Sequence, residues 1–306
     1  MNRLSNAASI ASSIANFIAL ACLAAPAIQA QAAITVHDDD GNAVTLEQPA
    51  RRVVALAPHV TELLFAAGGG ERIVGTVNYS DYPEAAKRLP RIGDNRQIDI
   101  ERVIALKPDL IVVWMHGSSA RQIDALRQLG IPLFHSEPKK LDAIADSVLR
   151  MGQLLGTESV ARPAAAKLRE QLAALGAKYA GRAPVRLFYQ VWDKPLYTLS
   201  GGHIVSDAVR LCGGDNVFAH MTVTAPVVGI EDVLREDPEA IVGSGEKNPP
   251  EGGVNMWRQY PAMRAVRADN LFILDGNLLN RAGPRMIAGA AALCDKLELA
   301  RQRRKN

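Results

Sequence analysis

Residues 100–112 read Ile-Glu-Arg-Val-Ile-Ala-Leu-Lys-Pro-Asp-Leu-Ile-Val, and residues 230–242 repeat the pattern as Ile-Glu-Asp-Val-Leu-Arg-Glu-Asp-Pro-Glu-Ala-Ile-Val. Each copy reads as a short helix, a proline that stops it and a buried strand. Each also carries one glutamate at the same place on its helix, Glu101 in the first copy and Glu231 in the second. The chain therefore builds one α/β unit twice, which predicts two matched lobes with one acidic point on each.

Strands and helices alternate around both copies. Strands are expected over 52–57, 73–77, 109–114 and 132–135, and again over 185–191, 240–242 and 271–274. Helices are expected over 61–67, 100–106 and 120–129, and again over 204–211, 231–236 and 285–299. We expect Pro58 to end the first strand and the basic residues 301–305 to form a solvated tail. Alternation of this kind indicates an α/β fold with two Rossmann-like lobes and mostly parallel sheets.

The region between the lobes has an almost entirely helical pattern. Residues 141–179 are rich in Ala, Leu, Lys, Arg and Glu, with a break at Gly156 and with Pro163 suited to a first helical turn. A helix over about 159–179 would span about 30 Å, enough to cross from one lobe to the other. Its place between the repeats favours a connecting strut, and two ordinary surface helices are the alternative.

The predicted organisation follows from these elements. It comprises an N-terminal hairpin over 33–50, an N-terminal lobe over 51–140, a helical linker over 141–181 and a C-terminal lobe over 182–306. The hairpin is expected because Asp40 and Gly41 form a turn signal between two alternating segments.

The first 32 residues have the composition of an export signal. Arg3 supplies a positive start, residues 14–28 are almost all apolar, and Ala30 and Ala32 form a small-x-small cleavage site. We expect a signal peptide over 1–32 that is cleaved, and a soluble mature protein, because no later stretch approaches the ~20 apolar residues of a membrane span. A retained anchor is the alternative to cleavage, and lipidation of Cys22 is a further, minor one. The net charge of +3 is too small and too scattered to indicate nucleic-acid binding.

Two cysteines, Cys212 and Cys294, remain after removal of the signal. An even pair in an oxidising compartment favours a disulfide, with two buried free thiols as the alternative.

Standard catalytic signatures are missing from the sequence. It contains no Gly-x-Ser-x-Gly, no HExxH and no P-loop, and its six histidines show no close metal-ligand spacing. His59 and His116 each follow an expected strand, where each fits either a metal or cofactor ligand or a polar wall residue. We therefore predict a protein that is not an enzyme, with no resident cofactor and no metal site.

Large aromatic side chains follow several of the expected strands. Tyr79 follows the strand over 73–77, Trp114 ends the strand over 109–114, and Trp192 follows the strand over 185–191. If the lobes face each other, these rings line one cleft and suit a bulky, partly apolar ligand. A core position is the alternative for Trp114.

Polar side chains follow the strand over 271–274. Asn277 and Asn280 can match the amide groups of a ligand, and Arg281 can match its carbonyl or phosphate groups. An ordinary loop before the last helix is the alternative.

Several motifs resemble one known family. The run over 52–114 contains Asn-Tyr-Ser-Asp-Tyr-Pro at 78–83 and the first copy of the repeat, and the likeness continues through 121–131, 211–218 and 281–285. This chain resembles the periplasmic receptors for iron-siderophores, haem and cobalamin (the class III periplasmic-binding family), and within them the cobalamin receptors. The resemblance covers nearly all of the chain after about residue 50 and implies a binding domain over 52–303.

The resemblance implies a fold, a partner and a set of site residues. Two α/β lobes joined by one long helix would hold the ligand between them and deliver it to an inner-membrane ABC permease dimer. The glutamates that dock on the permease fall on Glu101 and Glu231. The ligand contacts fall on Tyr79, Trp114 and the loop Asn277, Leu278, Leu279, Asn280 and Arg281.

The chain departs from the cobalamin receptors in that loop. They have Asp-Trp-Phe-Glu-Arg there, and they have a tryptophan where this chain has Asn95. Two aromatic contacts are lost, so the identity of the ligand stays open between a corrinoid, haem and a ferric siderophore. We predict a periplasmic, monomeric receptor for cobalamin or a related corrinoid. A haem or ferric-siderophore receptor is the alternative, and an exported metal-dependent enzyme is less favoured.

Overall fold

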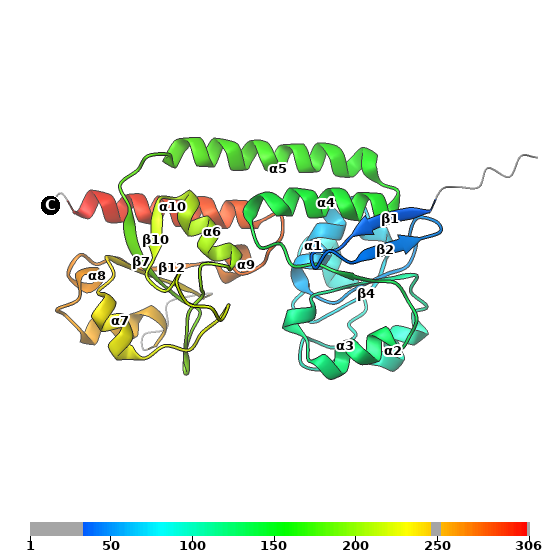
Figure 1. Cartoon of the computed structure of the whole chain (residues 1–306), viewed down its shortest axis with the longest axis horizontal. Helices are drawn as coiled ribbons and strands as arrows, with labels where there is room; N and C mark the ends of the chain where they lie inside the picture. The colour runs from blue at the N-terminus through cyan, green and yellow to red at the C-terminus, as the bar shows by residue number, and fades with distance from the viewer. Residues whose placement is uncertain (1–32, 246–251, 305–306) are drawn as a thin grey trace, which may run out of the picture. The chain divides into compact units, whose positions relative to one another are not determined.

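The computed structural model describes residues 33–245 and 252–304 and contains two four-stranded parallel sheets, one in each half of the chain (Figure 1). The first has the strand order β4-β3-β5-β6 and the second the order β10-β7-β11-β12. The first sheet is formed by Val53–Ala55 (β3), Ile73–Thr76 (β4), Leu110–Val113 (β5) and Leu133–His135 (β6). The second is formed by Val185–Gln190 (β7), Gly214–Asn216 (β10), Ala240–Ser244 (β11) and Leu271–Leu274 (β12). The predicted pair of α/β lobes is confirmed.

Helices lie between and after the strands of each lobe. In the first lobe they are Pro58–Ala66 (α1), Ile100–Ala105 (α2) and Ala120–Arg127 (α3), with 3₁₀ turns at Gly70–Arg72 (η1), Glu84–Arg88 (η2) and Met115–Gly117 (η3). In the second lobe they are Ile204–Leu211 (α6), Ile230–Glu236 (α7), Arg264–Arg267 (α8), Gly276–Leu279 (α9) and Met286–Arg303 (α10), with a 3₁₀ turn at Gly253–Gln259 (η4).

A capping carboxylate and a proline explain where two helices of the first lobe begin. The Asp99 carboxylate accepts a hydrogen bond from the Arg102 N–H at 2.9 Å and so caps α2. The expectation that Pro58 ends a strand is wrong: Pro58 opens α1, three residues before the expected start. Proline fits there because the first helical N–H groups have no partner within the helix.

Two helices lie between the lobes. Leu141–Leu155 (α4) ends at Gly156, whose φ of 62° turns the chain into Glu158–Tyr179 (α5). A left-handed φ costs glycine little, which explains the break at this position. Since α5 begins at Glu158, Pro163 lies inside the helix, and the expectation that it occupies the first turn is wrong.

The helix α5 reaches elements of both halves, which confirms the predicted long connecting helix. It packs on α4 and α1 and also on α6 and α10 (Figure 1). At its end, the Tyr179 hydroxyl donates a hydrogen bond to Asp295 of α10 at 2.6 Å.

One buried cluster continues from the first sheet to the second. It includes Val53 and Leu110 of the first lobe, Leu154 of α4, and Leu187 and Val242 of the second lobe. Successive side chains of a strand point to opposite faces of the sheet. The strand residues that alternate with those of the shared cluster therefore pack on the other face, in a separate cluster in each lobe. The lobes therefore share a core on the side of α4 and α5.

Two small antiparallel pairs complete the fold. Ile34–His37 (β1) pairs with Ala43–Leu46 (β2), as the hairpin signal predicts, and Trp192–Asp193 (β8) pairs with Leu196–Tyr197 (β9). The signal-peptide prediction for 1–32 lies outside the described residues. Among the residues that the structure describes, no helix combines the length and the apolar character needed to cross a bilayer.

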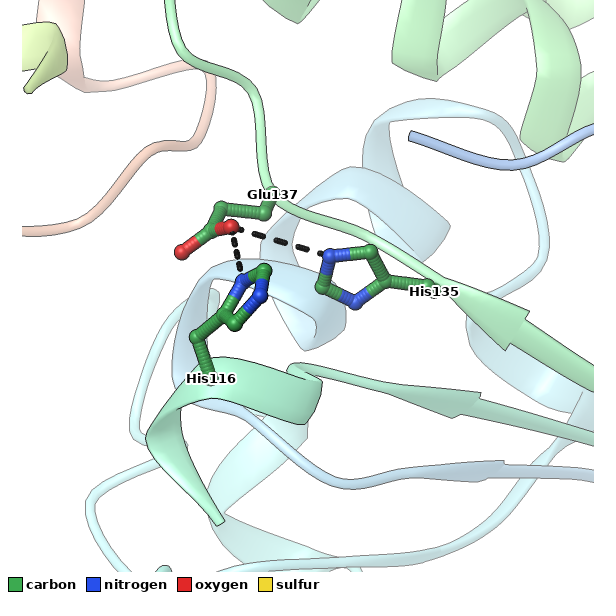
Figure 2. A group of neighbouring side chains, drawn as sticks. All are labelled: His116, His135 and Glu137. Atoms are coloured by element: carbon green, nitrogen blue, oxygen red, sulfur yellow. Dashed lines mark hydrogen bonds and ion pairs between the residues drawn. The ribbon is translucent and has the colours of Figure 1, made fainter. Parts of the chain in front are cut away.

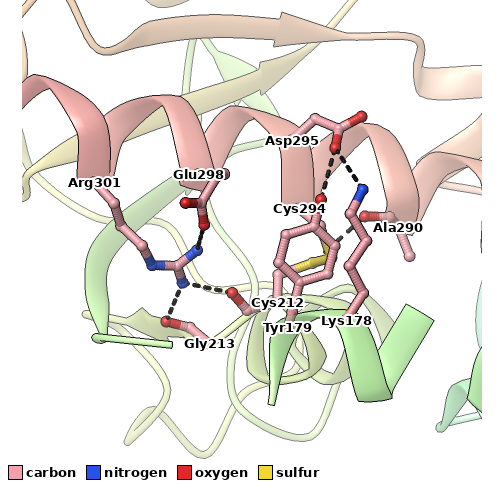
Figure 3. The surroundings of a disulfide bond; sticks show 9 residues. All are labelled: Lys178, Tyr179, Cys212, Gly213, Ala290, Cys294, Asp295, Glu298 and Arg301. Atoms are coloured by element: carbon pink, nitrogen blue, oxygen red, sulfur yellow. Dashed lines mark hydrogen bonds and ion pairs between the residues drawn. A yellow bond between two sulfur atoms is a disulfide. The ribbon is translucent and has the colours of Figure 1, made fainter. Parts of the chain in front are cut away.

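The predicted disulfide is present. Cys212, at the end of α6, is bonded to Cys294 of α10, and both are fully buried (Figure 3). Arg301 lies further along α10 than Cys294. Its guanidinium donates hydrogen bonds to the carbonyls of Cys212 at 2.6 Å, Gly213 at 3.1 Å and Ala183 at 2.7 Å. The expected solvated tail from 301 is therefore wrong for Arg301, because α10 continues to Arg303 and buries this side chain.

Candidate functional site

Trp114 is held at the carboxyl end of β5 by contacts on three sides. Its indole N–H donates to Oε1 of Glu137 at 2.8 Å, and the ring meets His59 edge-on at a centroid distance of 6.0 Å. A Cβ atom at Gly117 would lie 2.0 Å from Cε3 of Trp114, so the chain can pass this ring only as glycine. The Trp114 side chain is half-buried, so its exposure decides neither for a core residue nor for a ligand contact.

Tyr79 follows β4 and projects from the surface. Its side chain is 76% exposed and its φ is 66°, a left-handed conformation that is uncommon for a residue other than glycine. The turn is closed by a hydrogen bond from the Asp81 N–H to the Tyr79 carbonyl at 3.0 Å. The backbone thus holds a large ring in water, where it is available to a ligand.

Trp192 lies at the carboxyl end of the second sheet and is 63% exposed. It lines a cavity of about 220 Å³ together with residues at the carboxyl ends of β7, β11 and β12, among them Gln190, Ser244 and Ile273. A larger cavity of about 890 Å³ lies elsewhere, between α1, α5 and α10. The position of Trp192 is the one expected for a ligand contact in a parallel sheet.

The loop predicted to hold ligand forms α9, and its side chains differ in access. Asn280 accepts a hydrogen bond from the Tyr189 hydroxyl at 2.6 Å and donates one to Ser244 at 2.8 Å, so it ties together the ends of β7 and β11. Burial raises the pKa of that hydroxyl, which keeps it a donor. Leu278 is half-buried, whereas Leu279 is fully buried in the shared core, and its side chain is closed to any ligand in this conformation.

Arg281 and Arg285 connect the second lobe to the first. Arg281 pairs with Asp81 at 2.6 Å and donates to the Asn277 side chain at 2.7 Å. Arg285 donates to both oxygens of Glu62, at 2.6 and 3.0 Å, and Glu62 is only 3% exposed. Burial alone would raise the pKa of Asp81, but the hydrogen bond and charge of Arg281 outweigh it and lower that pKa. Arg281 therefore joins the loop after β4 to α9.

The two matched glutamates occupy equivalent places. Glu101 lies in the first turn of α2 and Glu231 in the first turn of α7, and both are exposed. Figure 1 shows α2 and α7 on the side of their sheets away from α5. A carboxylate in a first turn is favoured by the helix dipole, so the position alone does not assign a role.

A cluster that the sequence analysis missed lies next to Trp114. The cluster consists of His116, His135 and Glu137 (Figure 2). In the chain, His116 lies 19 positions before His135 and 21 before Glu137. The Glu137 carboxylate accepts a hydrogen bond from His116. The signal that could have found it is the strand order, because β5 and β6 are neighbours and Val113 pairs with His135. Residues just beyond two adjacent parallel strands must meet at one edge of the sheet.

His59, the other histidine with two open alternatives, is a buried structural partner here. Its Nε2 lies 3.0 Å from the Ser136 carbonyl, and burial lowers the pKa of the imidazole. The neutral form therefore predominates.

Residues 53–278 match the family model described as periplasmic binding protein. The vitamin B12-binding protein of Vibrio cholerae is 40% identical over 255 residues, which cover 83% of this chain and 91% of the relative. The vitamin B12-binding protein of Yersinia pestis is 38% identical over 250 residues, or 82% of this chain and 87% of the relative. The chain belongs to the periplasmic binding protein family, as the motifs predicted.

Solved structures agree with this assignment. The crystal structure of the periplasmic vitamin B12 binding protein of Vibrio cholerae superposes with a TM-score of 0.78 at 39% identity, covering 83% of this chain and 98% of that one. A periplasmic haem-binding protein solved with two haems has a TM-score of 0.73 at 22% identity, covering 83% of this chain and 99% of that one, and shares the fold.

Proposed function

We propose that this chain is the periplasmic receptor that captures cobalamin or a related corrinoid and delivers it to the permease of an ABC importer. The observation that supports this most is the 40% identity to a vitamin B12-binding protein over 83% of the chain. A likeness at this level over both lobes extends well beyond the fold that haem-binding proteins share. The proposal includes export by the segment 1–32 and a monomeric mature protein.

The receptor acts by binding, without covalent chemistry. The exposed rings of Tyr79 and Trp192 and the half-buried ring of Trp114 supply flat apolar surfaces for a corrin ring. Asn277 and Asn280, near the ends of β11 and β12, supply amide groups for the polar rim of the ligand. Leu278 supplies the apolar contact of this loop, and Leu279 supports it from the core.

Delivery uses the repeated glutamates. Glu101 and Glu231 present one exposed carboxylate from each lobe, and the two pair with basic groups on a permease dimer. Exposed ion pairs of this kind steer and orient the encounter more than they tighten it, and salt weakens them.

An absorbance titration of the purified protein with cyanocobalamin, haemin and a ferric hydroxamate tests the ligand. We expect saturable 1:1 binding of cyanocobalamin that is tighter than binding of the other two. Tyr79→Ala should weaken that binding more than Tyr79→Phe, since the ring supplies most of the contact area. Preferred binding of haemin or of the hydroxamate would reject the corrinoid assignment.

A separate measurement tests delivery. Vesicles that contain the cognate permease take up labelled cobalamin from the loaded receptor. Glu101→Ala with Glu231→Ala should abolish uptake and leave ligand affinity unchanged. Glu170→Ala, which removes an exposed carboxylate from α5, is the matched control and should leave uptake unchanged. Lost affinity in the double variant would place these glutamates in the ligand site instead.

A further inference from the structure

The ligand atoms of three side chains meet at one edge of the first sheet. One ligand atom each from His116, His135 and Glu137 lies within 4.8 Å of the other two (Figure 2). Oε2 of Glu137 contacts His116 directly and lies 3.7 Å from Nε2 of His135. We propose that these three residues bind a divalent transition-metal ion of the zinc class.

The state of His135 supports this proposal independently of the spacing. The residue is fully buried, and Nε2 has no hydrogen-bond partner among the described residues. Two carboxylate oxygens face this nitrogen from distances too long for a hydrogen bond, at 3.7 Å from Glu137 and 3.8 Å from Asp40. Native structures rarely leave a buried polar nitrogen unpaired, and a metal ion between the three side chains would satisfy it.

The donor set selects the class of metal. Two imidazoles and one carboxylate suit Zn²⁺, Ni²⁺, Co²⁺ or Cu²⁺, whereas Mg²⁺ and Ca²⁺ require a shell of oxygen atoms. Three protein ligands also leave a coordination position open for water or for an exchanging ligand. His116 is exposed, so an ion can enter from solvent and the His116 ring can turn to accommodate it.

A second layer of contacts orients the carboxylate. Oε1 of Glu137 accepts from the Trp114 indole at 2.8 Å, which leaves Oε2 directed at the two histidines. The Glu137 N–H donates to Asp39, which pairs in turn with Arg150. Outer partners of this kind fix the direction of a metal ligand.

Binding requires one proton to move on His135. The Met115 N–H donates to Nδ1 of that ring at 3.2 Å, so the neutral imidazole carries its proton on Nε2. Coordination through Nε2 transfers this proton to Nδ1. The neutral ring therefore keeps its proton, and the Met115 hydrogen bond is the contact that is lost.

Calorimetry on the untagged mature protein tests the site. After treatment with a chelator, the protein is titrated with Zn²⁺, Ni²⁺ and Mg²⁺, and Co²⁺ serves as a spectroscopic probe through its d–d absorption. We expect one Zn²⁺ per chain, no saturable binding of Mg²⁺, and Co²⁺ bands typical of nitrogen and oxygen ligation. Zn²⁺ should also change the tryptophan fluorescence, because Trp114 is hydrogen-bonded to a metal ligand.

Variants separate this site from other histidines. His116→Ala and Glu137→Gln should each weaken Zn²⁺ binding by more than about tenfold. His116 is exposed, so His116→Ala keeps the fold, and circular dichroism verifies this. His220→Ala removes an exposed histidine elsewhere and should leave the affinity unchanged. Absence of 1:1 Zn²⁺ binding, or equal affinity in His116→Ala, would overturn the inference. The inference does not rest on the proposed function, because corrinoid affinity is measured separately.

Discussion

Removal of the disulfide should cost the fold about 4.5 kcal/mol of unfolding free energy. The change is Cys212→Ala with Cys294→Ala, which deletes a bond that closes a sequence separation of 82 residues. On the chain-entropy model, a loop of this length restricts the unfolded chain by about 15 cal/mol/K, which gives about 4.5 kcal/mol at 25 °C. The bond joins α6 to α10 in the core. Without it, these two segments can move apart in the unfolded chain, and the gain in chain entropy favours unfolding.

Urea unfolding followed by circular dichroism measures this loss. The midpoint of thermal unfolding should fall by about 8 °C for a chain of this length. Wild-type protein unfolded under reducing conditions is the control, because it keeps both sulfur atoms and lacks only the bond. The two should agree within about 1 kcal/mol, since the alanines add only a small cavity. A loss below about 1 kcal/mol in both samples would refute the entropic reasoning.

Three further changes test individual contacts. Glu62→Gln should destabilise the protein by about 3 kcal/mol in urea unfolding, because it removes a buried charge from two arginines, whereas the exposed Glu84→Gln should cost less than about 0.5 kcal/mol. Burial lowers the pKa of His203 to about 4 against a partial opposing effect of Glu137, so the unfolded chain binds an extra proton between about pH 6.5 and 4. The free energy of unfolding should therefore fall by up to about 3 kcal/mol as the pH drops through that window. His203→Asn can still cap α6 and should make the urea midpoint less dependent on pH in the same window. Arg301→Ala should lower thermal stability by about 2 kcal/mol, since it strands carbonyls that the guanidinium now binds.

Local patterns predicted most of the fold. The repeated unit places α2 before β5 and α7 before β11, and in both copies the proline and the apolar run mark the ends of the elements. The break at Gly156 can likewise be predicted from the sequence, because the helix end depends only on the left-handed backbone conformation of this glycine. Signals that act within a few residues can be interpreted without the tertiary structure.

Contacts between distant segments could not be predicted in the same way. Arg301 reads as part of a basic tail, and only the approach of the segments before β7 and after α6 to α10 supplies the carbonyls that bind it. The convergence of His116, His135 and Glu137 depends on β5 and β6 being neighbours. The sequence placed Leu279 in a ligand loop, whereas the packing of α9 against α10 turns it into the core. Side-chain direction at a loop depends on packing that spacing does not reveal.

The contacts between the lobes argue for a receptor that opens little. An opening that separated Glu62 from Arg285 would leave a nearly buried carboxylate unpaired, which costs about 3–5 kcal/mol. It would also strain the core that continues from Val53 through α4 to Val242. The proposed ligand contacts Tyr79 and Trp192 are exposed, so ligand entry on their side would leave the helical side closed. Small-angle X-ray scattering should accordingly give the same radius of gyration with and without cyanocobalamin, and a large decrease on binding would show that the Glu62 contacts break in the free protein.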